Sequence, residues 1–184
     1  MSFKIIPSII PDCFEIEFSR IVDNRGHFTK TFNIELFKEL NIKMEYAEEY
    51  FTYSDFNVLR GLHFQIPPKA IDKIVFCVSG SVTDFVVDIR KESPTYGQHV
   101  SFELNEETPK AIFVPKGLAH GFHVLSKSAL MQYKVSDVFN KECDTGISYK
   151  TFPFAKNIVN PILSERDNKF VTFEEFNSSF IFNK

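Results

Sequence analysis

Residues 58–73, VLRGLHFQIPPKAIDK, place Arg60, His63 and Lys73 within apolar segments that are typical of strands. Tyr133 lies in a similar apolar segment, ALMQYKV, further along the chain. Burying such groups without partners costs free energy, so together they predict a cavity that holds an anionic ligand. His63 is the candidate base of that cavity, because a histidine with a pKa of about 6.5 is largely neutral near pH 7.

The spacing of Arg60 and His63 requires an irregular strand, because side chains three residues apart point to opposite faces of a regular one. Gly61 lies between them and permits a bulge, which would turn both side chains towards one cavity. Taken singly, the same two residues would be a surface arginine and a core histidine with its own hydrogen-bond partner. Their combination with Lys73 and Tyr133 favours the shared cavity.

The other histidines are weaker candidates. His27 and His99 lie beside turn residues, which indicates structural or surface roles. His120 and His123 are three residues apart in VPKGLAHGFHVL, so at most one of them is expected to point into the interior of a barrel.

The middle of the chain has the pattern of β-strands. In SVTDFVVDIR, apolar and polar residues alternate, which predicts a half-buried strand with Asp84 and Asp88 on its solvated face. The turn signal Ser79-Gly80 separates this segment from KIVFCV and predicts a β-hairpin. AIFVP, GFHVLS and ALMQYKVSDVF add further short strands between turns.

Two short helices are expected among these strands. Asn33 can cap IELFKEL, in which Ile34, Phe37 and Leu40 recur at helical spacing. Ser164 can cap a second helical stretch in LSERDNKF. Several short strands with frequent turns predict an all-β protein, an antiparallel sandwich or barrel. A jelly roll of this kind has an interior that can hold a small ligand.

The bulk composition is that of an ordinary globular protein. The 184 residues predict a single domain over residues 1–184, and the formal net charge of -3 argues against a protein held to nucleic acid mainly by its charge. Three widely spaced cysteines without a CxxC pair predict reduced thiols and a cytoplasmic location. Prolines interrupt the N-terminal segment and no run of about 18 apolar residues occurs, so neither a signal peptide nor membrane insertion is expected.

The segments DNRGHFTKTF, NVLRGLHFQ, VDIRKESPTYG, VPKGLAHGF and MQYK occur in an order and spacing that resembles the RmlC-like family of dTDP-4-dehydrorhamnose 3,5-epimerases. LSERD is similar to the closing motif of that family, and PKGLAH resembles the second motif of the cupin superfamily. The resemblance implies a cupin-type jelly roll, usually a homodimer. It also implies epimerisation of a nucleotide-diphospho-4-keto-6-deoxy sugar without a metal or an organic cofactor.

The resemblance further implies a role for individual residues. His63 would be the base that removes a proton beside the keto group, and Asp167 would orient it. Lys73 would stabilise the enolate oxygen, and Tyr133 would return a proton from the opposite face. The residues implied in substrate binding are Arg60 at the diphosphate, Arg25 at the nucleotide end, and His120, Gln65, Lys30, Glu48, Tyr50 and Phe139.

The sequence allows two interpretations of Asp84. Asp84 matches a family position near the catalytic residues, but its strand pattern is equally that of a solvated face.

The departures from the family pattern are concentrated in three places. Lys30 stands where a glutamate is typical, Glu48-Glu49-Tyr50 replaces Gln-Asp-Asn, and Phe139 replaces a tyrosine or tryptophan. The first two affect the region that holds thymine and ribose in the family. The sequence therefore predicts the same proton transfer, at carbon 3, carbon 5 or both, on either a dTDP-hexose or a GDP-linked 6-deoxy-heptose.

Two hypotheses from other classes stay open at this point. A metal-dependent cupin enzyme would require an HxH pair and a glutamate, but the chain has His63-Phe64-Gln65 followed by Pro67 and Pro68. A non-catalytic sugar-nucleotide binding module would need the arginines but would have no use for Tyr133.

Overall fold

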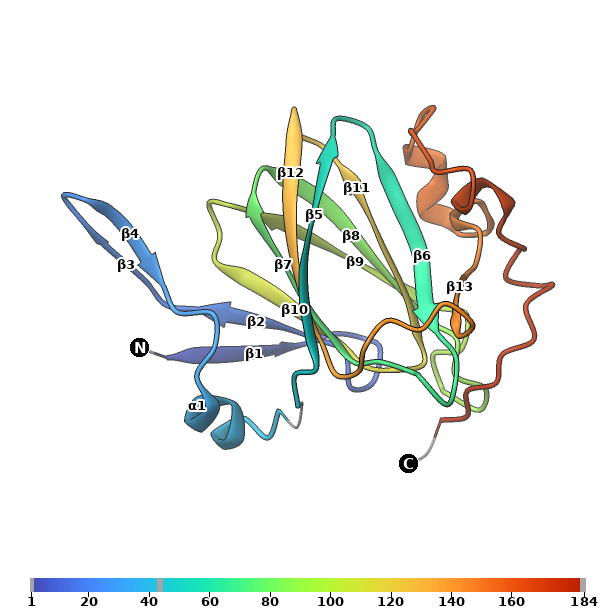
Figure 1. The fold of residues 1–184 in the computed structure, drawn as a ribbon, viewed down its shortest axis with the longest axis horizontal. Helices are drawn as coiled ribbons and strands as arrows, with labels where there is room; N and C mark the ends of the chain where they lie inside the picture. The colour runs from blue at the N-terminus through green and yellow to red at the C-terminus, as the bar shows by residue number, and fades with distance from the viewer. Residues whose placement is uncertain (1, 43–44, 183–184) are drawn as a thin grey trace.

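Two antiparallel sheets pack against each other and form the body of the molecule (Figure 1). The structure is a computed structural model that describes residues 2–42 and 45–182. The six-stranded sheet has the order β1 (Phe3–Pro7), β2 (Phe14–Phe18), β10 (Lys110–Val114), β7 (Lys73–Ser79), β12 (Ser128–Val135), β5 (Glu48–Asp55). The five-stranded sheet has the order β13 (Asp144–Gly146), β6 (Leu59–Gln65), β11 (Leu118–Val124), β8 (Ser81–Asp88), β9 (His99–Asn105). The predicted all-β, cupin-type sandwich is confirmed.

The main core lies between these sheets because each sheet presents apolar side chains to the other. Val75 and Ile112 come from the six-stranded sheet, Val86 and Leu104 from the five-stranded sheet, and each is almost fully buried. Burial of apolar surface of this kind supplies most of the free energy that holds two such layers together.

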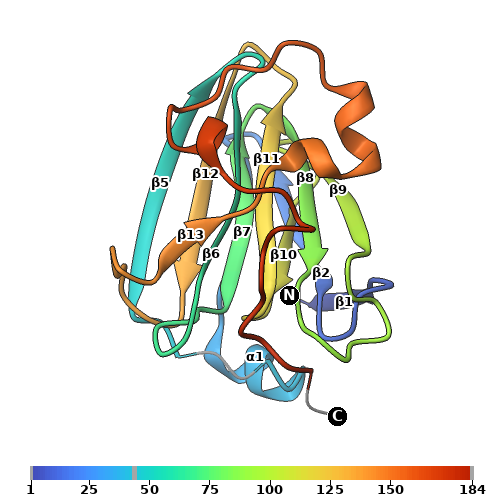
Figure 2. The same cartoon turned by 90° about the vertical axis from the view of Figure 1, so that its right-hand side faces the viewer.

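The outer face of the five-stranded sheet is also covered, which corrects the predicted half-buried strand. The C-terminal segment, with the 3₁₀ helices η1 (Tyr149–Thr151), η2 (Pro153–Asn157) and η3 (Asp167–Lys169), crosses that face (Figure 2). Phe85 on β8 stacks on Phe154 of this segment, with ring centroids 4.0 Å apart. Asp84 and Asp88 lie on the other face of β8, with Val82 and Val86 and towards the interior of the sandwich, so they are fully buried and not solvated as predicted.

The turn at Ser79-Gly80 joins two sheets, so the predicted β-hairpin is wrong. β7 belongs to the six-stranded sheet and β8 to the five-stranded sheet, so the two strands do not pair. Gly80 has a φ of 85°, and a Cβ at this position would lie 2.1 Å from the carbonyl oxygen of Ser128. The glycine therefore permits a tight corner between the layers, a connection with the same local sequence pattern as a hairpin.

The helices are short, as the sequence predicts. α1 (Ile34–Glu39) begins where expected, since the Asn33 side chain accepts hydrogen bonds from the backbone N–H groups of Glu35 and Leu36. The stretch after Ser164 is shorter than expected: its helical part is the single turn η3, although the Ser164 hydroxyl does accept from the Asp167 N–H. Within the described residues, no helix is long and apolar enough to cross a membrane.

A separate two-stranded hairpin, β3 (Arg20–Asp23) and β4 (Gly26–Thr29), projects away from the body of the molecule (Figure 1). Its apolar side chains are largely exposed, with Val22 at 73% and Phe28 at 53% of their full accessibility. Because a two-stranded ribbon is marginally stable alone, this element is expected to find a packing partner.

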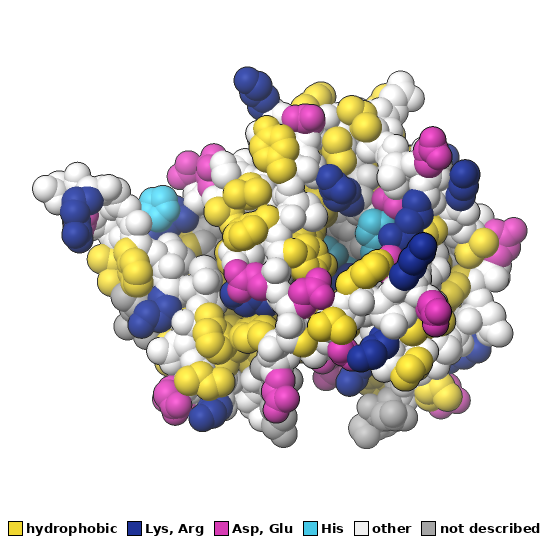
Figure 3. Space-filling view, viewed as in Figure 1, with side chains coloured by type: hydrophobic (Ala, Val, Ile, Leu, Met, Phe, Trp, Pro, Cys, Tyr) yellow, Lys and Arg dark blue, Asp and Glu magenta, His cyan; other side chains and the backbone are white. Residues whose placement is uncertain are grey.

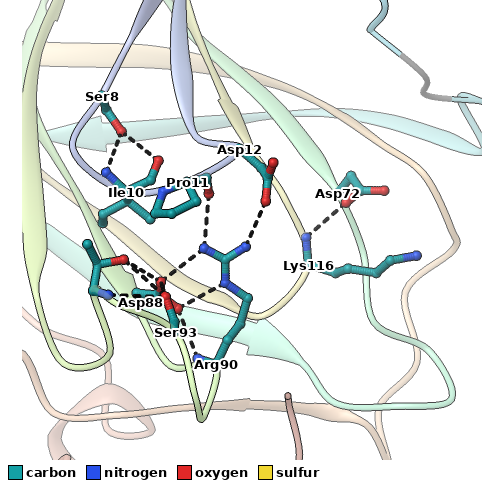
Figure 4. A network of polar contacts seen from close by, with 10 residues as sticks. Ser8, Ile10, Pro11, Asp12, Asp72, Asp88, Arg90, Ser93 and Lys116 are labelled. Atoms are coloured by element: carbon teal, nitrogen blue, oxygen red, sulfur yellow. Dashed lines mark hydrogen bonds and ion pairs between the residues drawn. The ribbon is translucent and has the colours of Figure 1, made fainter. Parts of the chain in front are cut away.

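A buried network of polar contacts closes one end of the sandwich (Figure 4). The Arg90 guanidinium donates to both carboxylate oxygens of Asp88 at 3.0 and 2.9 Å, and it also donates to Asp12 in the N-terminal loop. Asp88 accepts further bonds from the hydroxyls of Ser93 and Thr95. Burial would raise the pKa of Asp88, but these hydrogen bonds hold it below its ordinary value.

We expect Arg90→Ala to lower the free energy of unfolding by about 3 kcal/mol, because it leaves the buried Asp88 carboxylate without its cation. Equilibrium unfolding in urea measures the change. Lys116→Ala is the control, since that exposed residue bonds to Asp72 only through its backbone N–H. A loss below about 1 kcal/mol, typical of an exposed ion pair, would contradict the structural role of Arg90.

Candidate active site

A cavity of about 310 Å³ opens between the two sheets and gathers most of the predicted site residues. In the space-filling view, histidine side chains are visible in a hollow on this face, with lysine and arginine side chains around it (Figure 3). The predicted residues that line the cavity are Glu48, Tyr50, Arg60, His63, Gln65, Lys73, His120, Tyr133 and Phe139. The structure thus brings together residues that are up to about half the chain apart in sequence.

The irregular strand predicted around Gly61 is present. In the pairing of β6 with β11, His63 lies opposite His120 and Arg60 lies opposite Phe122, so β6 carries one extra residue between the two pairs. Gly61 has a φ of 119°, and a Cβ there would lie 2.7 Å from the carbonyl oxygen of His120. The bulge turns both Arg60 and His63 towards the cavity.

His63 forms a hydrogen-bonded pair with Asp167. Its Nε2 donates to Asp167 Oδ1 at 2.8 Å, while Asp167 Oδ2 accepts from the backbone N–H of Gly61 at 2.9 Å. Burial would raise the pKa of Asp167, but the bonds from His63 and Gly61 hold it below its ordinary value. An ionised Asp167 keeps the proton of a neutral imidazole on Nε2, which leaves Nδ1 free to accept a proton.

Lys73 lies beside this pair at the start of β7. Its ammonium group donates to the carbonyl oxygen of His63 at 3.1 Å, and the residue is almost fully buried. Burial lowers the pKa of Lys73 to about 8, although the charges of Asp144 and Asp84 oppose that shift. The group is therefore a cation near neutral pH whose charge is only partly compensated.

Tyr133 lies on the other sheet from His63. β12 carries Tyr133 in the six-stranded sheet and β6 carries His63 in the five-stranded sheet, yet both side chains line the same cavity. Burial raises the pKa of Tyr133 well above its ordinary value, and the nearby Asp84 and Tyr50 add to that shift. A neutral phenol on one wall thus faces an imidazole on the other.

A second histidine–carboxylate pair lies deeper in the sandwich. His120 Nε2 donates to Asp84 Oδ2 at 2.8 Å, and both residues are buried. Burial lowers the pKa of His120 and raises that of Asp84. Asp84 is therefore a partner of a cavity residue, and its other oxygen has no hydrogen-bond partner among the described residues. His123 bonds to Asn57 and does not line the cavity, which confirms that only one of the two neighbouring histidines points inward.

Several predicted binding residues shape the rim of the cavity. The Gln65 amide donates to the carbonyl oxygen of Lys69 and accepts from the N–H of Asn140, so its polar atoms connect the loop after β6 to the loop after β12. Glu48 accepts from the N–H of Phe139 in the same loop, and the Phe139 ring is 62% exposed at the rim.

Arg60 is held at the rim by the neighbouring sheet. Its Nε donates to the Ser54 hydroxyl at 2.8 Å, and the residue itself is exposed.

Arg25 and Lys30 lie outside this cavity in the single chain. Arg25 is at the tip of the β3–β4 hairpin, 85% exposed, and bonds to Asp23 of the same turn at 2.6 Å. Lys30 follows β4 directly.

The sequence did not predict Asp144, which lines the cavity from β13 and pairs with Arg166 at 2.7 Å. No local motif marks this short edge strand, so only its pairing with β6 reveals it.

Among residues 2–42 and 45–182, no three histidine, cysteine, aspartate or glutamate side chains are grouped as metal ligands. The two cavity histidines are instead each bonded to a carboxylate through Nε2. The imidazole on one wall and the phenol on the opposite wall have the chemistry of a base and an acid, which the inversion of a carbon centre between them would require. Together with the jelly roll, this arrangement is typical of the cupin-type epimerases.

The comparisons with known proteins agree with that class. Residues 7–175 match the family model described as dTDP-4-dehydrorhamnose 3,5-epimerase. The dTDP-4-dehydrorhamnose 3,5-epimerase of Shigella flexneri is 39% identical over 179 residues, which cover 94% of this chain and 99% of that protein. The chain therefore belongs to the dTDP-4-dehydrorhamnose 3,5-epimerase family, and it is an epimerase-type isomerase.

Solved structures show the same likeness. The RmlC enzyme of Legionella pneumophila Philadelphia 1, in complex with dTDP-4-keto-L-rhamnose, has a TM-score of 0.90 and 31% identity, covering 99% of this chain and 100% of that chain. A 3'-monoepimerase from Streptomyces bikiniensis, solved as a double mutant with dTDP, has a TM-score of 0.85 and 25% identity, covering 91% of this chain and 86% of that one.

Proposed function

We propose that the protein inverts carbon 3, carbon 5 or both in a nucleotide-diphospho-4-keto-6-deoxy sugar, as one domain over residues 1–184. The observation that carries this proposal is the placement of His63 and Tyr133 on the two facing sheets around one cavity. The names of the relatives support a dTDP-linked sugar. We further infer that the reaction takes place in the cytoplasm and supplies precursors of cell-surface polysaccharides.

The keto group at carbon 4 acidifies the C–H bonds of its two neighbours. His63 Nδ1 would accept the proton from one of these carbons, and the electron pair would move into an enolate whose oxygen lies near the Lys73 ammonium. The imidazolium would be stabilised by ionised Asp167. Tyr133 would then give its phenolic proton to the opposite face of the carbon. The imidazolium would release its proton to solvent, and a proton from solvent would restore the phenol.

Lys73 gives this mechanism a distinctive pH dependence. Because its pKa is about 8 in the folded state and about 10.5 in the unfolded state, the unfolded state binds more protons between these pH values. We expect kcat to fall as the pH rises through about 8, because the enolate loses its cation. We expect the free energy of unfolding to rise over the same range.

Lys73→Met should remove both pH effects and lower kcat by about 10². The pH profiles of kcat and of urea unfolding measure them, and Lys110→Met on the neighbouring strand β10 is the control. A kcat that stays constant up to pH 10 in the unchanged protein would contradict this role of Lys73.

The residues at the rim of the cavity are the basis for proposing which nucleotide and which sugar bind. Arg60 would bind the diphosphate, since a guanidinium group matches paired phosphate oxygens. The exposed ring of Phe139 would stack on the base. Lys30 and Glu48–Tyr50 depart from the family pattern, so a GDP-linked 6-deoxy-heptose is an alternative to a dTDP-hexose.

Turnover of dTDP- and GDP-linked 4-keto-6-deoxy sugars by the purified protein, followed by NMR in D₂O, tests the proposal. The proposed function requires deuterium at carbon 3, carbon 5 or both of an inverted product with at least one of these substrates. Absence of inversion with every substrate would refute it. Activity confined to the dTDP-hexose would refute only the heptose alternative.

We also propose that the protein acts as a homodimer. Arg25 lies at the tip of the exposed β3–β4 hairpin and outside the cavity of its own chain, so a role at the nucleotide requires a second copy. Light scattering of the purified protein should give twice the chain mass of 21.3 kDa. A monomer with full activity would exclude this role for Arg25.

A further inference from the structure

Tyr50 lies against the proposed acid. Tyr50 on β5 is the direct cross-strand partner of Tyr133 on β12. Their rings are stacked, with centroids 4.8 Å apart and planes inclined by 13°. The His120 and Tyr133 rings meet in an edge-to-face geometry, with centroids 6.1 Å apart and planes at 74°. The Tyr133 ring therefore has an aromatic neighbour in a stacked geometry and a second one in an edge-to-face geometry.

We propose that Tyr50 is a positioning residue, whose ring holds the Tyr133 phenol at the wall of the cavity opposite His63. This inference rests on the proposed function and adds a residue to it. Tyr50 belongs to the Glu48–Tyr50 segment, which differs from the Gln-Asp-Asn pattern that the family resemblance implies. The family resemblance therefore does not explain why an aromatic residue stands at this position.

Stacking constrains Tyr133 because a phenol attached to a strand can otherwise rotate about its side-chain bonds. Cross-strand aromatic pairs stabilise one relative arrangement of the two rings. Proton delivery depends on that arrangement, since a displacement of about 1 Å in a reacting group can reduce a rate by about 10². A ring at position 50 thus acts on reprotonation and leaves proton removal by His63 unaffected.

The ring of Tyr50, and not its hydroxyl group, provides this function. Burial, together with the charges of Glu48 and Asp144, raises the pKa of Tyr50 to about 12, so the side chain stays neutral at neutral pH. A neutral neighbour tolerates the phenolate that Tyr133 forms after it gives up its proton, whereas an anion would oppose it. Phenylalanine at position 50 should therefore serve as well as tyrosine.

Three variants test this inference: Tyr50→Leu, Tyr50→Phe and the control Tyr53→Leu. Tyr53 lies on the same strand, but its side chain is 63% exposed and does not line the cavity. Two rates are measured by NMR in D₂O with the substrate that the unchanged protein turns over. One is the formation of the inverted product, and the other is the exchange of the substrate's own C–H for deuterium without inversion.

We expect Tyr50→Leu to form inverted product about 10- to 100-fold more slowly while its exchange without inversion stays within about threefold. Tyr50→Phe and Tyr53→Leu should retain both rates. A merely structural role of Tyr50 would lower the two rates together. The ratio of the two rates therefore reports positioning of the acid and not loss of folded protein.

Each other outcome overturns a defined part of the account. Inversion at the normal rate in Tyr50→Leu, or an equal loss of both rates, would refute the positioning role. Inversion as slow in Tyr50→Phe as in Tyr50→Leu would show that the hydroxyl group takes part and would also refute it. Failure of the unchanged protein to invert any 4-keto sugar would instead refute the proposed function itself.

Discussion

His63→Asn is expected to lower both inversion and solvent exchange at the sugar carbons by about 10³, since both begin with proton removal by the imidazole. Asparagine is polar but shorter, and its amide does not reach the position of Nε2, which donates to Asp167 at 2.8 Å in the unchanged protein. It has no basic nitrogen to accept the proton. NMR in D₂O measures both rates on the same sample.

His99→Asn is the matched control for this prediction. His99 packs against Phe152 and Phe154 on the outer side of the five-stranded sheet and does not line the cavity. Its replacement should leave both rates unchanged. Exchange at the normal rate in His63→Asn would show that another group removes the proton, and the assignment of the base would then be wrong.

Tyr133→Phe is expected to separate the two rates. Phenylalanine fills nearly the same volume and can still stack on Tyr50, but it has no proton to give to the far face of the carbon. Inversion should fall by about 10³, while exchange without inversion, which needs only His63, should stay within about tenfold. No other single replacement in the cavity is expected to separate the two rates as widely.

Tyr149→Phe is the control, because Tyr149 is equally buried but lies in η1, outside the cavity. It should change neither rate by more than about twofold. If Tyr133→Phe abolished exchange as completely as inversion, Tyr133 would take part in proton removal. The assignment of proton removal to His63 and of proton return to Tyr133 would then be refuted.

Local patterns are sufficient to predict the central strands β6, β7, β8, β10, β11 and β12 and the first helix. Asn33 and the spacing of Ile34 and Phe37 locate α1, because capping and burial of one helix face are local effects. The Ser79-Gly80 turn has the sequence pattern of a hairpin because a corner between two sheets has the same local requirements. Which of the two forms depends on strand pairing with distant segments, which the turn sequence does not contain.

The burial of Asp84 and Asp88 could not be predicted for a similar reason. Alternation along β8 gives a buried and an exposed face only if nothing covers the second face. Phe154 and the rest of the C-terminal segment, more than sixty residues later in the chain, cover the apolar face of β8 that carries Phe85 and Val87. The face with Asp84 and Asp88 therefore lies towards the interior of the sandwich, beside Val82 and Val86, and not towards solvent. The aspartates are then tolerated because Arg90 and His120 bond to them.

The site itself could partly be predicted from the sequence, because one local feature, Gly61, allows Arg60 and His63 to share a cavity. The other residues around the site are harder to predict from the sequence. Asp144 comes from a three-residue edge strand, and Arg25 lies on an exposed hairpin outside the cavity of its own chain.

The central claim is that His63 and Tyr133 act on opposite faces of one carbon. A crystal structure of the Tyr133→Phe variant with its bound 4-keto sugar nucleotide tests it most directly. We expect carbon 3 or carbon 5 to lie between the imidazole Nδ1 and the edge of the phenyl ring that replaces the phenol, with the keto oxygen near the Lys73 ammonium. A sugar with both groups on the same side of its ring, or bound away from one of them, would contradict the account.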